Sequence, residues 1–187
     1  MDPFRAVLDA CVLFPASLRD TLLRAAEHDL YQPRWSRDIL EELRRSLVEH
    51  GKSDSIHAQR LIDTLREAFD DAEVWGYEHL IKDMPNHPLD RHVLAAAVAS
   101  QADAIVTLNV KDFPAESARS LGLQVQTPDV FLMRLFDEAP RIMEQITEEQ
   151  AAFLRNPPMT IDDVLDNIEP FAPSFVRAVR QRRSRRG

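Results

Sequence analysis

Short apolar runs alternate along this chain with longer segments in which apolar residues recur every three or four positions. The short runs predict buried strands, and the longer segments predict amphipathic helices. Residues 34–35 are expected to form a short extended link. Strands are expected at residues 4–8, 72–75, 103–108 and 123–126. Helices are expected at residues 15–28, 37–50, 54–69, 77–84, 89–99 and 127–137.

Side chains that favour helix N-termini precede several of these helices. After residue 140 the pattern is purely helical, and prolines break it into two or three short helices. One of them begins at Thr160–Asp163, which resembles a capping box with aspartate in place of glutamate. The candidate N-caps of the earlier helices are Ser36, either Ser53 or Asp54, and Thr127.

The repeated alternation of strand and helix predicts an α/β fold with a central parallel sheet and right-handed connections. We expect this domain to cover residues 1–137. Residues 138–187 are expected to form a helical extension that ends in an arginine-rich tail. No internal repeat is evident.

Composition and charge limit the environment in which the chain works. The single cysteine, Cys11, excludes an intramolecular disulfide and a cysteine-based zinc site. No leader-like segment or membrane-length apolar run is found, so we expect a cytoplasmic protein without a membrane partner. The net charge is -8, but the last 17 residues contain six arginines and no acid. The acidic excess elsewhere could reflect carboxylates gathered around a cation.

Several classes of chemistry are disfavoured. The four glycines are widely separated, so no glycine-rich loop can cradle a nucleotide phosphate. No Gly-x-Ser-x-Gly segment is present, which argues against a serine hydrolase. The six histidines lack zinc-ligand spacing; His87 and His92 are five positions apart, which would put them on different faces of a helix. The histidines are therefore not expected to be metal ligands.

Four carboxylates occupy positions of chemical interest. Ligands of open α/β sheets bind beyond the carboxyl ends of the strands. Asp9 ends the first strand, Asp112 follows the strand at residues 103–108, Asp90 begins the helix that leads into that strand, and Glu42 lies on the second helix. Singly, each could be a turn residue, a helix cap or a solvated acid. Together, at these positions, they favour a shared site.

The sequence resembles the PIN-domain family over roughly residues 4–136. Four segments carry the resemblance, in family order and with family spacing, and the last two are the most specific. They are Val7-Leu8-Asp9-Ala10, Trp35-Ser36-x-x-Ile39-Leu40-x-Glu42-Leu43, Asp90-Arg91-His92-Val93-Leu94-Ala95-Ala96-Ala97, and Val106-Thr107-x-Asn109-x-x-Asp112-Phe113.

The resemblance implies a compact three-layer α/β/α fold and a four-acid site that holds Mg²⁺ or Mn²⁺. By position, the acids fall on Asp9, Glu42, Asp90 and Asp112, and Asn109 and Thr107 are implied to line the site. Glu41 is the alternative candidate for the second acid. Glu42 is preferred because the family motif puts its acid directly before the leucine. Cys11 departs from the small polar residue common two positions after the first acid, and we interpret it as a small buried apolar residue.

The implied activity is hydrolysis of RNA. Repulsion among four carboxylates would raise some of their pKa values, and a hard divalent cation would remove that cost. We expect a metal-activated water to attack the phosphodiester in line and leave 5′-phosphate and 3′-hydroxyl ends. Asp9, Asp90 and Asp112 would be the principal ligands, and Glu42 would be a ligand or would orient the water.

Basic residues are needed to attract a polyanion to an acidic site. Arg34, Arg37 and Lys111 are the main candidates for phosphate contact, together with Arg5 and the arginines of the tail. The alternative for the tail is a disordered end that does not touch RNA. The tail arginines are Arg177, Arg180, Arg182, Arg183, Arg185 and Arg186.

Many bacterial PIN-domain proteins are VapC-type toxins, which are dimeric and are silenced by a cognate antitoxin. The resemblance therefore implies a homodimer with an antitoxin partner. The helical extension at residues 138–187 is expected to be where the antitoxin docks or where protomers meet. Two alternatives stay open: an inactive PIN-like binding module, and a free-standing housekeeping nuclease without an antitoxin.

Overall fold

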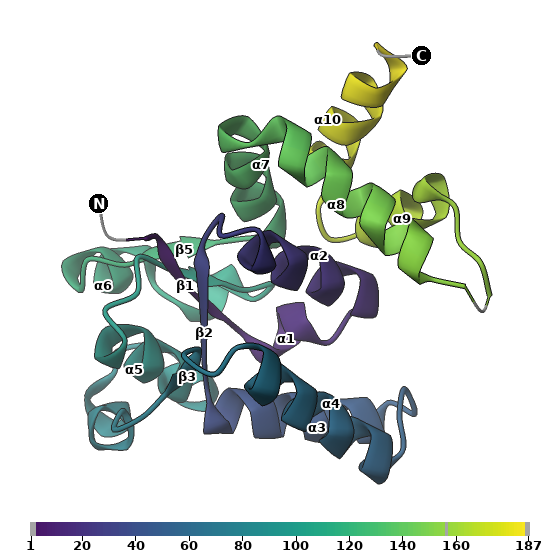
Figure 1. Cartoon of the computed structure of the whole chain (residues 1–187). Coiled ribbons are helices and arrows are strands. Elements are labelled where there is room, and N and C mark those ends of the chain that lie inside the picture. The colour runs from purple at the N-terminus through teal and green to yellow at the C-terminus, as the bar shows by residue number, and fades with distance from the viewer. Residues whose placement is uncertain (1–2, 156, 186–187) are drawn as a thin grey trace. The chain divides into compact units, whose positions relative to one another are not determined.

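The structure, a computed structural model, describes residues 3–155 and 157–185 (Figure 1). Within those residues the chain divides into two compact units. The sheet unit comprises Met1–Phe14 and Tyr31–Gln126, and the helical unit comprises Pro15–Leu30 and Thr127–Gly187. The expected α/β architecture with additional C-terminal helices is confirmed.

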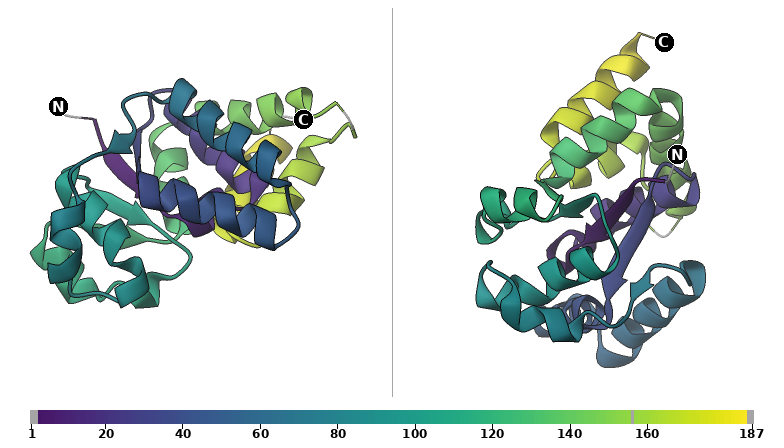
Figure 2. Two further views of the ribbon diagram at one scale, coloured as in Figure 1. Left: turned by 90° about the horizontal axis from the view of Figure 1, so that it is seen from below. Right: turned by 90° about the vertical axis from the view of Figure 1, so that its left-hand side faces the viewer.

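The sheet unit contains five strands and the helices that flank them (Figure 2). Its α-helices are α1 (Ala10–Leu13), α3 (Arg37–Glu49), α4 (Ser55–Ala68), α5 (Arg91–Ala99) and α6 (Ala115–Ser120). Its 3₁₀ helices are η1 (Glu78–Asp83), η2 (Pro88–Asp90) and η3 (Val110–Asp112). Its strands are β1 (Arg5–Leu8), β2 (Gln32–Ser36), β3 (Glu73–Val74), β4 (Ala104–Val106) and β5 (Gln124–Gln126).

All neighbouring strands are parallel, in the order β3-β2-β1-β4-β5. The apolar residues of β1 and β4 are fully buried, as expected of central strands covered on both faces. Helix α5 packs on β1, β2 and β4, and its run of alanines allows this close approach. Because the strands are parallel, the segments that follow β1, β2 and β4 all emerge at one edge of the sheet.

The segment at residues 34–35 is part of a full strand, β2, and not only an extended link. Pro33 obscures this in the sequence because proline cannot donate to a sheet ladder. Gln32 donates its N–H to Phe4, and Trp35 donates to Ala72, so alternate residues face the two neighbouring strands. The nitrogen of Pro33 therefore faces the side on which β3 has not yet begun, where no donor is needed.

The helix boundaries largely follow the predicted capping residues. The Ser36 hydroxyl accepts the N–H of Ile39 at 3.2 Å, and Asp54 accepts the N–H of His57 at 2.8 Å. Thr160 and Asp163 form the expected capping box. The segment expected as a helix at residues 77–84 is instead the 3₁₀ helix η1.

The helical unit consists of α2 (Ala16–Glu27), α7 (Pro128–Glu138), α8 (Pro140–Phe153), α9 (Ile161–Ile168) and α10 (Pro173–Ser184). Helix α2 packs on α8 and α9, although more than 100 residues of chain separate them. Asp129 of α7 accepts the N–H groups of Ser174 and Phe175 at 2.8 and 3.1 Å, which satisfies donors in the first turn of α10.

The basic tail is helical through Ser184, and several of its arginines pair with acids of the same unit. Arg180 pairs with Asp166 and Glu169. The guanidinium of Arg182 lies 3.0 Å from the buried carboxylate of Glu144, and Arg183 lies 3.4 Å from Glu148. Arg186 lies outside the described residues. None of the described helices is both long and apolar enough to cross a lipid bilayer.

Candidate active site

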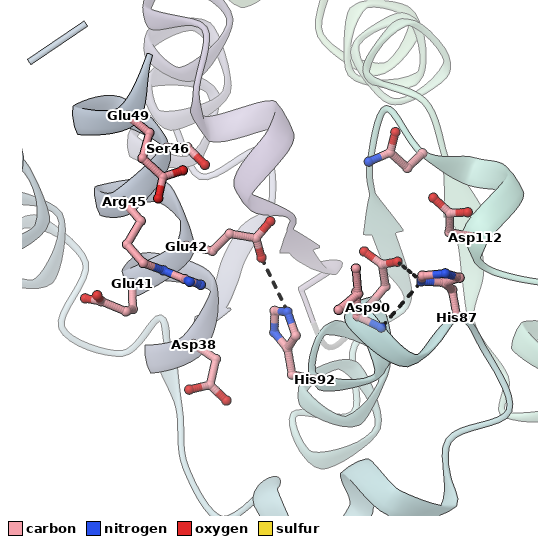
Figure 3. A pocket seen from close by; sticks show the side chains of 12 residues that line it. Asp38, Glu41, Glu42, Arg45, Ser46, Glu49, His87, Asp90, His92 and Asp112 are labelled. Carbon is pink, nitrogen blue, oxygen red and sulfur yellow. Dashed lines mark hydrogen bonds and ion pairs between the residues drawn. The ribbon is translucent and has the colours of Figure 1, made fainter. Parts of the chain in front are cut away.

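An acidic cavity of about 590 Å³ opens in the sheet unit (Figure 3). One side is formed by α3, and the other by residues 87–92 and the loop that contains η3. The lining from α3 is Asp38, Glu41, Glu42, Arg45, Ser46 and Glu49. The opposite lining is His87, Leu89, Asp90, His92, Asn109 and Asp112. Three of the four predicted acids, and Asn109, therefore lie in one cavity.

Asp9, the fourth predicted acid, directly follows β1 and is only 2% exposed. The Thr107 hydroxyl donates a hydrogen bond of 2.7 Å to Asp9 Oδ2, and the same hydroxyl accepts the N–H of Asn109 at 3.0 Å. Thr107 thus links the buried acid to the loop that lines the cavity. Its predicted place beside the site was inferred from the family motif, and its role as a hydrogen-bond donor is visible only in the structure.

Burial raises the pKa of Asp9, and the negative charge of Glu42 raises it further. Hydrogen bonds from Thr107 and Cys11 act in the opposite direction because they stabilise the carboxylate. The net shift is upward. The ionised form of Asp9 is therefore held at a cost in free energy, which a nearby cation would offset.

Cys11 is a hydrogen-bonding residue here, and not only a small apolar one. Its thiol donates to Asp9 Oδ2 over 3.2 Å and accepts the N–H of Leu108 at 3.3 Å. Burial, followed by the charge of Asp9, raises the pKa of the thiol to about 12. The thiol stays protonated at neutral pH, so it can do the work of the small polar residue common at this position.

Asp90 and Asp112 are brought together by the backbone of His87. The His87 N–H donates to the carbonyl of Asp112 at 3.2 Å, which joins the segment before α5 to the loop after β4. Its ring Nδ1 lies 3.3 Å from Asp90 Oδ2. Burial raises the pKa of Asp90, the charges of Asp9, Asp112 and Glu42 raise it further, and His87 lowers it. The charges of the other three predicted acids therefore all act on Asp90.

Glu42 is held by a histidine on the opposite wall, as Figure 3 shows. His92 Nε2 lies 3.4 Å from Glu42 Oε2. Burial lowers the pKa of His92, but the hydrogen bond and charge of Glu42, together with the charges of Asp38 and Asp9, outweigh it, so the net shift is upward. Glu41, in contrast, is exposed to solvent and pairs with Arg44 at 2.7 Å on its own helix.

The two histidines are site residues that sequence reasoning missed. His87 and His92 were set aside because their spacing puts them on different faces of a helix. His87 precedes α5, however, at the N-terminus of η2, so the helical rule does not apply to it. Their adjacency to Asp90 and to the motif at residues 90–97 was the one available signal.

The predicted RNA-binding cations do not line the cavity. Arg37 and Lys111 are exposed, but neither is among the lining residues. Arg34 donates to the Pro33 carbonyl at 2.8 Å and to the Gln32 side chain at 3.0 Å. Arg45, which sequence reasoning did not single out, is the cation that α3 contributes to the cavity wall.

The donor chemistry of the site suits a hard divalent cation. Four carboxylates and the amide of Asn109 offer oxygen ligands of the kind that Mg²⁺ and Mn²⁺ prefer. Among residues 3–155 and 157–185, no three acidic, histidine or cysteine side chains stand in metal-binding geometry. Asp9, Glu42 and Asp90 instead contact Thr107, His92 and His87 respectively.

Comparisons with known proteins match both units. The family model described as PIN domain matches residues 5–111, and the model described as VapC50 C-terminal domain matches residues 128–181. The protein named "Putative ribonuclease VapC50" of Mycobacterium tuberculosis (strain ATCC 25618 / H37Rv) is 34% identical over 110 residues. That match covers 59% of this chain and 65% of the relative, so the chain spans slightly under two thirds of its length.

A solved structure, that of VapBC-1 from nontypeable Haemophilus influenzae, is also similar. The sequence identity is 19% and the TM-score is 0.45. The match covers 65% of this chain and 98% of that one.

Proposed function

Because this chain belongs to the PIN domain family, we propose that it is a metal-dependent endoribonuclease that hydrolyses RNA phosphodiester bonds. The observation that carries the proposal is geometric: Glu42, Asp90 and Asp112 line one cavity, and Asp9 is hydrogen-bonded to Thr107, which leads into the loop that lines it. Carboxylates that come from different elements of the fold and raise one another's pKa values are typical of a metal-dependent active site.

Asp9, Asp90 and Asp112 would hold Mg²⁺ or Mn²⁺ through their carboxylate oxygens. Such an ion, when bound, lowers the pKa of a coordinated water and stabilises charge on the phosphoryl oxygens. Glu42 Oε2, positioned by His92, would accept a hydrogen bond from the attacking water and orient it. Asn109 would donate to the substrate from the cavity wall.

In the proposed reaction the water oxygen forms a bond to phosphorus, and the bond from phosphorus to the 3′ oxygen breaks. The proton of the water passes to solvent or to Glu42, and the departing 3′ oxygen takes up a proton. The products carry a 5′-phosphate and a 3′-hydroxyl. Hydrolysis by water leaves the 2′-hydroxyl unchanged, which separates this reaction from transesterification to a cyclic phosphate.

The biological role that we propose is that of a VapC-type toxin, acting in the cytoplasm as a homodimer and silenced by a cognate antitoxin. Support comes from the relative VapC50 and from the match of residues 128–181 to the VapC50 C-terminal domain. The second match covers most of the helical unit.

Sequencing the ends of cleaved RNA tests the proposed activity. Purified protein, incubated with RNA and Mg²⁺ or Mn²⁺, should generate 5′-phosphate and 3′-hydroxyl ends at discrete positions. Asp90→Ala should not generate them. Identical ends from wild type and Asp90→Ala, or 2′,3′-cyclic phosphate ends, would show that another activity or a contaminant is responsible.

Two single substitutions show which of the two neighbouring glutamates of α3 contributes to cleavage. We expect Glu42→Gln to reduce the rate of RNA cleavage roughly ten- to a hundredfold, since the side chain that faces His92 loses its charge. Glu41→Gln is the matched control and should change the rate less than about threefold, because Glu41 pairs with Arg44 on the helix surface. Initial cleavage rates of both variants, measured on one substrate, check the assignment. The opposite order would make Glu41 the functional acid.

A further inference from the structure

Trp75 is exposed in an unusual place for a large aromatic residue. Its side chain is 71% exposed and directly follows β3, at the carboxyl edge of the sheet. The second tryptophan, Trp35, is fully buried. A tryptophan that has no internal packing role, at the edge where ligands of parallel sheets bind, points to an intermolecular contact.

The local backbone fixes the position of Trp75. Gly76 has φ of +73°, a conformation that favours glycine, and the chain turns sharply there. Tyr77 returns to the interior, where it is nearly fully buried, and its hydroxyl accepts the N–H of Asp38 at 3.4 Å. Asp38 itself lines the acidic cavity. The turn at Trp75 is therefore connected, through the hydrogen bond between Tyr77 and Asp38, to the N-terminal end of α3, which forms part of the cavity wall.

The strand register places Trp75 near the predicted acids. Val74 pairs with Ser36, so Trp75 is level with Arg37, the exposed first residue of α3. Strand β3 is two positions from β1, whose carboxyl end carries Asp9. Neighbouring strands lie about 4.8 Å apart, which puts the Trp75 backbone roughly 10 Å across the sheet from β1.

The surroundings of Trp75 suit a planar ligand better than an apolar one. The residues next to it in sequence that are exposed, Gly76, Glu78 and His79, offer no large aliphatic surface. An isolated ring is not the contiguous apolar patch that a protein partner buries. A nucleobase can stack on a single ring of this kind, whatever its identity. Arg37, exposed and one residue beyond the Ser36–Val74 pair, offers a cation for a neighbouring phosphate.

We propose that Trp75 is a stacking platform for an unpaired base of the RNA substrate, and that Arg37 contacts the phosphate beside it. The inference rests on the proposed function and adds to it a contact for an unpaired base at the end of β3. Paired bases are stacked on each other and cannot cover an isolated ring. Trp75 is thus a substrate-binding residue that lies outside the four-acid site.

Intrinsic fluorescence tests this proposal directly. The full chain is titrated in EDTA, which prevents metal-dependent cleavage, with a single-stranded RNA oligonucleotide and with a duplex of the same sequence. We expect the single strand to quench emission from the exposed Trp75, while the buried Trp35 provides an unchanged background. The duplex should produce little quenching.

Three variants complete the test. Trp75→Ala should weaken binding of the single strand about 5- to 150-fold, the range expected for loss of one stacked base. Trp75→Phe keeps an aromatic face and should restore most of the affinity. Ile56→Ala, which removes a side chain that is 65% exposed on α4, is the matched control and should bind as wild type does.

Two results would overturn the inference. If Trp75→Ala binds single-stranded RNA as tightly as wild type does, no base stacks there, and the exposed ring would instead suit a protein partner. If that variant still cleaves RNA normally, the proposed function stands and only the stacking platform is refuted. If wild type binds neither RNA in EDTA, the inference fails, and the cleavage assay with Mg²⁺ or Mn²⁺ decides the proposed function separately.

Discussion

Replacing Asp9 with asparagine is expected to reduce RNA cleavage by about 10³-fold while the fold is retained. Loss of a carboxylate that holds a catalytic cation removes several kcal/mol of transition-state stabilisation. Asparagine has the shape of aspartate, and its amide oxygen can still accept the hydrogen bond from Thr107. Initial rates under saturating Mn²⁺ measure the loss, and far-ultraviolet circular dichroism checks the fold. A variant with full activity would remove Asp9 from the site.

The same variant has a distinct pH signature in the metal-free protein. Because the pKa of Asp9 is raised on folding, its contribution to stability is complete below the unfolded value of about 3.9 and is lost as pH rises through the folded value. Asparagine does not titrate. In EDTA, Asp9→Asn should therefore gain stability relative to wild type as pH rises above 4. Urea unfolding of both proteins across this range measures the difference.

Removal of divalent cations should have the second large effect. EDTA is expected to abolish cleavage, and Mn²⁺ added to one hundred times its Kd should stabilise the folded protein by about 2.7 kcal/mol. For a protein of this size that corresponds to roughly 5–10 °C in Tm. The gain arises because the cation relieves repulsion among carboxylates whose pKa values are raised at the site.

The double variant Asp90→Asn/Asp112→Asn is the control for this measurement. It should show no Mn²⁺-dependent rise in Tm, because two of the proposed ligands are gone. It should also be at least as stable as wild type in EDTA, since fewer negative charges face Asp9. An equal Mn²⁺ response in wild type and double variant would place the cation elsewhere.

The two central strands could be predicted because β1 and β4 are short, fully apolar or nearly apolar runs. Asp9 stands where such a run stops, so the sequence itself marks it as a strand-end residue. The convergence of Asp90 and Asp112 follows from parallel topology, which brings the ends of distant strands to one edge. The capping residues were readable because each cap depends on contacts three residues away.

Interactions between residues far apart in sequence could not be read in the same way. The contact of His92 with Glu42 and that of Cys11 with the Leu108 N–H depend on which segments the fold brings together, and no local pattern encodes that. The basic tail was judged by composition alone. Its ion pairs with acids of α8 and α9 depend on the packing of the helical unit.

Helix α2 belongs to the helical unit, yet it is made long before the other helices of that unit. It ends at Glu27, and its partner α8 begins only at Pro140. A ribosome that adds 5–20 residues each second needs roughly 6–23 s to synthesise the intervening chain. During that interval α8 and α9, the helices against which α2 packs, have not yet been made. This unit can therefore assemble only near the end of translation.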